Sequence, residues 1–135
     1  APICEYLCDL VAEPTLIGAL GTYERAQHAQ WTAFVLTELD AYLWSDFKHT
    51  HVYPKENRST RITASNAKEI QSALDVLDKE LASRDFLIGN RFSVTDIIVG
   101  WSINWAANTD HLAAFTQLSR YLARLQERKH CTIKP

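Results

Sequence analysis

The 135-residue sequence has no methionine, only 4 glycines and 4 prolines, and 3 cysteines. So few turn-forming residues argue against an all-β fold made of many short strands. The odd, sparse set of cysteines does not fit a disulfide framework, and it favours reduced thiols and a cytoplasmic location. No apolar run reaches the length of a membrane span. The formal net charge of −2 also lacks the basic excess that nucleic-acid or anionic-membrane binding requires, so we expect no nucleic acid and no membrane as partners.

The length and a hydrophobic content of 47% fit one globular domain that buries a core without metals or disulfides. Because no initiator methionine is present and the residues from Ala1 onward already have a helical pattern, we expect the chain to start inside a larger protein. Apolar residues at helical spacing predict a helix over 3–12. Pro14, Gly18 and Gly21 then interrupt the pattern, which predicts a linker over 13–22.

Further helices are predicted from hydrophobic periodicity over 23–47, 60–83, 94–107 and 112–129. The polar segment 48–61 contains Pro54 and is predicted to be a loop. The 94–107 helix is apolar on every side, which predicts that it lies buried at the centre of the domain. The charged residues of the 60–83 helix are predicted to form a solvated face: Asp75, Asp78, Lys79 and Glu80. The fold class is therefore all-α, a bundle of about five helices.

Ser93 and Asp96 mark the start of the 94–107 helix. Ser93 stands at the N-cap position, and Asp96 follows at the third helical position. This spacing predicts a capping box, in which the two side chains satisfy backbone N–H groups of the first turn. The capping box accounts for Asp96 without a catalytic role, so we assign both residues to fold stability.

The run FLIGNRFSVTDI at 86–97 resembles the central signature of the glutathione S-transferase C-terminal domain, Phe-Leu-x-Gly-x-x-Phe-Ser/Thr-x-Ala-Asp-Ile. Only Thr95 departs from that pattern, where the family has Ala. The segments 25–34, 74–81 and 121–128 are also similar to helices of the family, so the likeness covers nearly the whole chain.

The resemblance implies that 1–12 is the last helix of a thioredoxin-like domain and that 23–135 is the helical C-terminal domain. It also implies that the glutathione site and the thiol-activating Ser, Cys or Tyr precede Ala1. Glutathione would then be the co-substrate, an apolar electrophile the second substrate, and a homodimer the assembly. The bacterial beta class places a His-Lys pair near the thiol, but the matching positions are Asp40 and Ala41. That class's contacts are therefore not transferred to this chain.

The resemblance places the first turns of the 23–47 helix at the domain cleft, which makes Tyr23, Gln27 and Gln30 candidates for substrate binding. The aromatic residues at helical spacing line either an acceptor pocket or the core: Trp31, Phe34, Trp44, Trp101 and Trp105. Asn104 and Asn108, one turn apart on an apolar helix, make either structural hydrogen bonds or substrate contacts. No catalytic residue is assigned within the chain.

Metal binding is not expected. His49 and His51 form a His-x-His pair, but nothing nearby in the sequence supplies further ligands. Cys4 and Cys8 share one face of the first helix and are expected to be buried as small apolar side chains.

Two functions are open at this point. The first is a detoxifying glutathione transferase, to which this chain contributes the substrate-binding domain. The chain alone would then be inactive. The second is a non-catalytic interaction module, because domains of this fold also mediate assembly in translation factors and tRNA synthetases. The residues that precede Ala1 would discriminate between the two functions.

Overall fold

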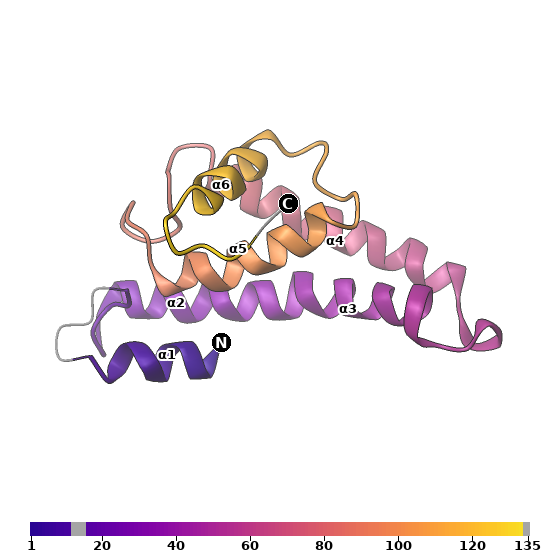
Figure 1. Ribbon diagram of the computed structural model, residues 1–135, viewed down its shortest axis with the longest axis horizontal. Coiled ribbons are helices and arrows are strands. Elements are labelled where there is room, and N and C mark those ends of the chain that lie inside the picture. The colour runs from indigo at the N-terminus through magenta and orange to yellow at the C-terminus, as the bar shows by residue number, and fades with distance from the viewer. Residues whose placement is uncertain (12–15, 134–135) are drawn as a thin grey trace.

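The computed structural model describes residues 1–11 and 16–133, and these residues are arranged as a bundle of helices (Figure 1). This confirms the predicted all-α fold. The principal elements are α1 (Pro2–Asp9), α2 (Tyr23–Phe34), α3 (Ala41–Phe47), α4 (Thr60–Glu80), α5 (Val94–Ala107) and α6 (Thr116–Gln126). The described part of the predicted linker, 16–22, contains no helix, and 12–15 lie outside the described residues.

One continuous helix runs from Tyr23 to Val52 along the length of the molecule (Figure 1). Two π-helical segments interrupt its α-helical turns, η1 (Val35–Asp40) and η2 (Lys48–Val52). The predicted loop over 48–61 is therefore wrong at its start, since η2 continues the helix to Val52 and a short 3-10 helix, η3 (Lys55–Asn57), follows Pro54. The helix passes position 47 because no proline or glycine stands before Pro54 to end it.

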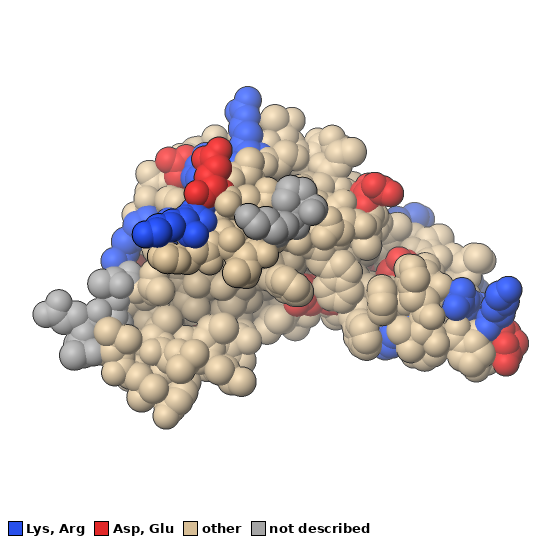
Figure 2. Space-filling view, viewed as in Figure 1, with Lys and Arg blue, Asp and Glu red and all other residues tan. Residues whose placement is uncertain are grey.

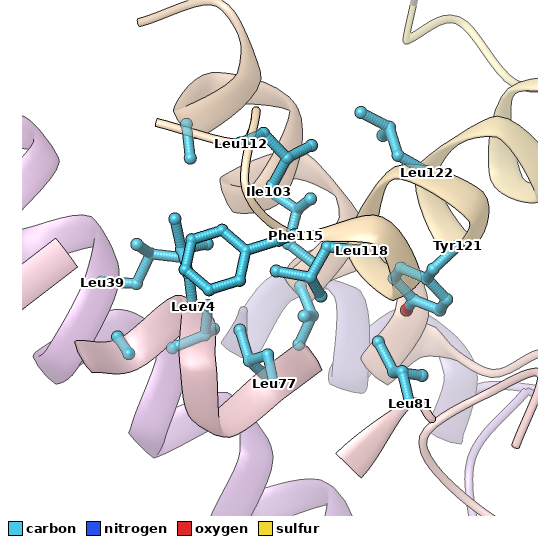
Figure 3. Close-up of a cluster of buried hydrophobic side chains, with 14 of the residues drawn as sticks. Leu39, Leu74, Leu77, Leu81, Ile103, Leu112, Phe115, Leu118, Tyr121 and Leu122 are labelled. Atoms are coloured by element: carbon cyan, nitrogen blue, oxygen red, sulfur yellow. The ribbon is translucent and has the colours of Figure 1, made fainter. Parts of the chain in front are cut away.

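The hydrophobic core lies where α4, α5 and α6 meet the long helix (Figure 3). An apolar seam on α4, with residues three and four positions apart, is buried at Ile70, Leu74, Leu77 and Leu81. The close-up shows Phe115 and Leu118 reaching between Leu39 of the long helix, the α4 leucines and Ile103 of α5. Helix α6 is shorter than the predicted 112–129. Its N-cap residue Phe115 and its apolar residues Leu118, Leu122 and Leu125 are buried.

Helix α5 has the predicted bounds, but its predicted burial on every side is wrong. Val99 and Ile103 are fully buried, whereas Ile97 is 42% exposed and Trp101 is 60% exposed. Ile97 and Trp101 are four residues apart and so lie on one face of the helix. The core contacts of α5 lie on its opposite side, at Val99, Ile103 and Ala106.

Asp96 joins three parts of the domain. Its Oδ2 accepts hydrogen bonds from the backbone N–H and the hydroxyl of Ser93, both at 2.8 Å, so the predicted capping box is present. Its Oδ1 accepts from the backbone N–H of Leu87 at 3.1 Å and from the hydroxyl of Tyr121 at 2.8 Å. The carboxylate is fully buried, so it connects α5 to α6 and to the 86–92 turn as well as capping α5.

The Tyr121 hydroxyl provides a stability test at alkaline pH. Burial, and then the charge of Asp96 and the hydrogen bond to it, raise the pKa of Tyr121 well above its usual value of 10.0. As the pH rises past the usual value of 10.0, Tyr121 loses its proton in the unfolded chain but keeps it in the folded chain, so the free energy of unfolding falls. We expect Tyr121→Phe to cost about 1 kcal/mol at neutral pH and to make the alkaline decline shallower. Urea unfolding of both proteins between about pH 8 and 11 measures this, and parallel curves would contradict it.

Helix α1 is attached to the bundle by polar contacts. Arg25 of α2 donates to both oxygens of Asp9, at 2.7 and 2.9 Å. The buried His28 has Nδ1 2.7 Å from the Thr95 hydroxyl of α5 and Nε2 3.3 Å from Glu5 Oε1, the latter without forming a hydrogen bond. Thr95, the one departure from the 86–97 signature, thus has a partner on the facing helix.

The apolar face of α1 points away from the bundle. Ile3, Tyr6, Leu7 and Leu10 are each more than half exposed. The part of the surface that α1 forms, at the lower left of Figure 2, shows no charged side chain in that view. The helix ends at Asp9 rather than at the predicted position 12. Cys4 and Cys8 are partly buried rather than enclosed, and burial is the main cause that raises the pKa of the Cys8 thiol.

Candidate functional site

An aromatic cleft of about 360 Å³ opens between α3 and the second half of α5. Its size is in the range of pockets that hold small organic ligands. Six residues line this aromatic cleft: Trp44, Phe47, Trp101, Asn104, Trp105 and Asn108.

The aromatic rings of the cleft hold one another in place. Trp44 and Phe47 are stacked, with their ring centroids 5.7 Å apart and an angle of 16° between the planes. Phe47 meets Trp105 of α5 edge to face at 6.4 Å, and its other neighbour is His51, stacked at 4.8 Å. Offset stacks and edge-to-face pairs are the geometries that aromatic quadrupoles favour. Trp44, Phe47 and Trp105 therefore form one connected wall, and Trp44 and Trp101 are open to solvent.

Two amide side chains line the cleft, in addition to the indole N–H groups of its tryptophans. Asn104 is buried, and its Oδ1 lies 3.5 Å from Gln126 Nε2 of α6. Asn108 is the C-cap residue of α5 and is exposed. The cleft thus combines flat apolar walls with amide groups that can donate or accept hydrogen bonds, which suits a planar apolar molecule with polar substituents.

Of the predicted substrate-binding residues, the structure places Trp105 and Asn108 together in the lining of the aromatic cleft. Tyr23 is 75% exposed at the start of α2, Gln30 is exposed, and Gln27 is half-buried. Trp31 and Phe34 pack edge to face at 5.8 Å against the core. These five residues do not line the aromatic cleft.

Sequence reasoning missed Phe47 as a cleft residue. Phe47 is the last residue of α3 and lies three positions after Trp44, so the two side chains share one face of that helix. This spacing within the predicted 23–47 helix is the signal that identifies Phe47.

Asp40 lies one turn before Trp44 on the long helix, at the last residue of η1. Burial raises the pKa of its carboxyl group above the usual range, and a hydrogen bond with Ser102 of α5 opposes this. Its Oδ1 is buried without a hydrogen-bond partner among the described residues. Asp40 is therefore a carboxyl group that holds a proton more readily than an exposed one, near the aromatic cleft but not lining it.

The two histidines of the His-x-His pair have structural contacts. His49 Nδ1 accepts from the backbone N–H of Ser59 at 3.3 Å, and His51 Nδ1 lies 2.7 Å from the Thr50 hydroxyl. Over the described ranges 1–11 and 16–133, no three His, Cys, Asp or Glu residues are grouped as metal ligands. Within the same ranges, no helix combines the length and apolar character needed to cross a membrane.

Comparison with known proteins gives consistent matches. A sequence model of the glutathione S-transferase C-terminal domain matches residues 60–124. Elongation factor 1-gamma of Artemia salina is 34% identical over 92 residues, which cover 66% of this chain and 20% of that protein. The chain thus spans about a fifth of that relative.

Solved structures match over nearly the whole chain. A sphingomonad glutathione S-transferase complexed with glutathione has a TM-score of 0.81 and 29% identity, over 95% of this chain and 61% of that one. The bacterial glutathione S-transferase BphK, solved as a ternary complex, has a TM-score of 0.81 and 24% identity, over 93% and 60% of the two chains. The chain spans about three fifths of each of these two structures.

Proposed function

We propose that this chain, whose fold and sequence are similar to the glutathione S-transferase C-terminal domain, is the substrate-binding domain of an enzyme that conjugates glutathione to an apolar electrophile. The observation that carries this proposal is the aromatic cleft between α3 and α5. Stacked rings there would hold a flat electrophile and exclude water from it, while Asn104 and Asn108 would orient its polar substituents. The reaction would be detoxification in the cytoplasm.

The thiol chemistry in this proposal lies outside the chain. We propose that a thioredoxin-like domain ahead of Ala1 binds glutathione and lowers the pKa of its thiol, which raises the thiolate fraction. The glutathione in the sphingomonad complex supports glutathione as the co-substrate. The outward apolar face of α1 supports a packed neighbour at that helix, because contiguous exposed apolar side chains mark interaction surfaces.

Trp101→Ala in the full-length protein tests the role of the cleft. Trp101 is mostly exposed, so its removal should leave folding intact, but it takes away one aromatic wall. We expect the KM for a chlorodinitrobenzene to rise about five- to tenfold, as expected for the loss of an aromatic contact. The KM for glutathione should not change. Val76→Ala, an exposed apolar change on α4, is the matched control. An unchanged KM for the halide would contradict the assignment of the cleft.

The similarity to elongation factor 1-gamma favours one alternative, a non-catalytic interaction module. Such a module would need neither a glutathione site nor a thiol-activating residue. The upstream sequence separates the two: a Ser, Cys or Tyr early in a thioredoxin-like unit and a Glu/Gln-Ser pair just before Ala1 would support the enzyme. Absence of any conjugation by the full-length protein, together with loss of these residues, would support the module.

We also propose that the full-length protein is a two-fold homodimer, the commonest symmetry of homo-oligomers. Part of the Tyr23 to Lys48 helix, or the loop that follows it, would lie in the interface, next to the exposed Trp44. Sedimentation equilibrium at micromolar concentration should give twice the chain mass, and a charge placed by Val52→Glu should weaken the dimer. A monomer at that concentration would contradict this assembly.

A further inference from the structure

A second cavity lies between the start of α5 and the segment that follows α6. After α6 the chain turns back and runs beside α5 (Figure 1). The enclosed volume is about 440 Å³, within the range typical of small-ligand pockets. We name it the tail cavity, and it shares no residue with the aromatic cleft.

The wall of the tail cavity is mainly aliphatic. Ile97 of α5, Leu125 of α6 and Ile133 of the last described segment supply it. The one phenyl ring in the lining, Phe92, has the guanidinium of Arg128 3.4 Å from its centroid. Because the cation covers that ring face, the cavity offers aliphatic surface rather than a free face for stacking.

Three consecutive basic residues lie on one segment of the lining of the tail cavity. Arg128, Lys129 and His130 follow one another along its lining. Asp96 also borders it and would repel an anion, but both oxygens of that carboxylate are already occupied by four hydrogen bonds. The Thr132 hydroxyl and the basic side chains are therefore left to meet a ligand's polar group, and only the basic ones carry the charge that favours an anion.

We propose that the tail cavity binds a small aliphatic carboxylate, with its hydrocarbon chain on Ile97, Leu125 and Ile133 and its carboxylate at Lys129 and Arg128. This class of ligand fits because its carboxylate complements the positive charge at the rim and its hydrocarbon chain is buried against the aliphatic wall. This site does not depend on the proposed conjugation reaction.

Cys131 gives a readout specific to this site. It is a free, partly buried thiol that lines the cavity, while Cys4 and Cys8 lie on α1 and do not. The full-length protein is treated with neutral iodoacetamide, and mass spectrometry of peptides gives the alkylation rate of each cysteine. We expect millimolar decanoate to slow alkylation of Cys131 and to leave the rates at Cys4 and Cys8 unchanged. Decanol, which lacks the charge, should protect Cys131 less.

Lys129→Gln tests the rim charge. We expect it to weaken protection by decanoate about two- to fivefold, as for loss of one exposed ion pair, and to leave protection by decanol unchanged. Lys68→Gln on α4, equally exposed and outside the cavity, is the matched control and should behave as the unaltered protein. Thermal melting of each variant confirms that it is folded.

Three results would overturn the proposal. These are no protection of Cys131 by decanoate, equal protection by decanoate and decanol, or equal slowing at all three cysteines. Tryptophan fluorescence adds an independent check, because no tryptophan lines the tail cavity and three line the aromatic cleft. Strong quenching by decanoate, without protection of Cys131, would place the ligand in the cleft instead.

Discussion

Replacing Asp96 with alanine is expected to lower the free energy of unfolding by about 3 to 5 kcal/mol, because it leaves several buried donors without an acceptor. The donors are the backbone N–H groups of Leu87 and Ser93 and the hydroxyls of Ser93 and Tyr121. Only the two hydroxyls can turn toward other acceptors, so the backbone groups bear most of the cost. Urea unfolding followed by circular dichroism measures the loss.

Two smaller substitutions serve as controls for Asp96→Ala. Ser93→Ala removes the cap alone and should cost about 1 kcal/mol. Asp78→Ala removes a half-buried carboxylate whose Oδ1 accepts from the backbone N–H groups of Gln117 and Leu118 at the start of α6, at 2.9 and 3.0 Å. It should cost about 1 to 2 kcal/mol, as for a helix cap. In the full-length protein, all three changes should leave the affinity of the aromatic cleft for its electrophile unchanged, because none of these residues lines that cleft. An Asp96 variant that unfolds normally but loses binding would overturn its assignment to the fold.

The isolated residues 1–135 are expected to show no glutathione conjugation above the uncatalysed rate. Conjugation requires that the thiol is held and loses its proton. The Ser93 and Tyr121 hydroxyls donate to the Asp96 carboxylate, but both residues are buried and cannot reach a bound thiol. Cys8 is also unsuited to this step, since its thiol has a raised pKa and so resists ionisation. An apolar cleft that binds substrate and transition state equally well does not lower the barrier.

The measurement is a conjugation assay with chlorodinitrobenzene on residues 1–135 beside the full-length protein at equal concentration. Quenching of tryptophan fluorescence by the halide checks, in parallel, that the cleft of the shorter chain still binds it. Activity in residues 1–135 comparable to full length would contradict the placement of the thiol chemistry upstream. Halide binding without turnover is the expected result.

The helices could be predicted because their signals are local. The seam of α4 and the start of α5 depend on spacing and capping within a few residues, and both agree with the structure. The end of the long helix was mispredicted because a polar composition at 48–52 outweighed the absence of a helix breaker. Periodicity also overestimated the burial of α5, since it reports how apolar a helix is but not which other element covers it.

Contacts between distant segments could not be predicted from the sequence. Asp78 reads as part of a charged, solvated face, yet it caps α6 some forty residues away. His28 lies off the apolar stripe of its helix, but packing brings it against Thr95 of α5. The same holds for the aromatic cleft, because Phe47 and Trp105 meet only once α3 and α5 have packed.

The π-helical segments have a consequence for sequence alignment. Each π turn holds one residue more than the α-helical turn it replaces, so it rotates the following residues by about 100° relative to a regular helix. If a relative lacks the extra residue within 35–40, an alignment pairs that relative's cleft residues with Trp44 and Phe47 only when it carries a gap inside the helix. Gaps for this chain therefore belong within Val35–Asp40 and Lys48–Val52, and placing them in the neighbouring loops would match the cleft to the wrong residues.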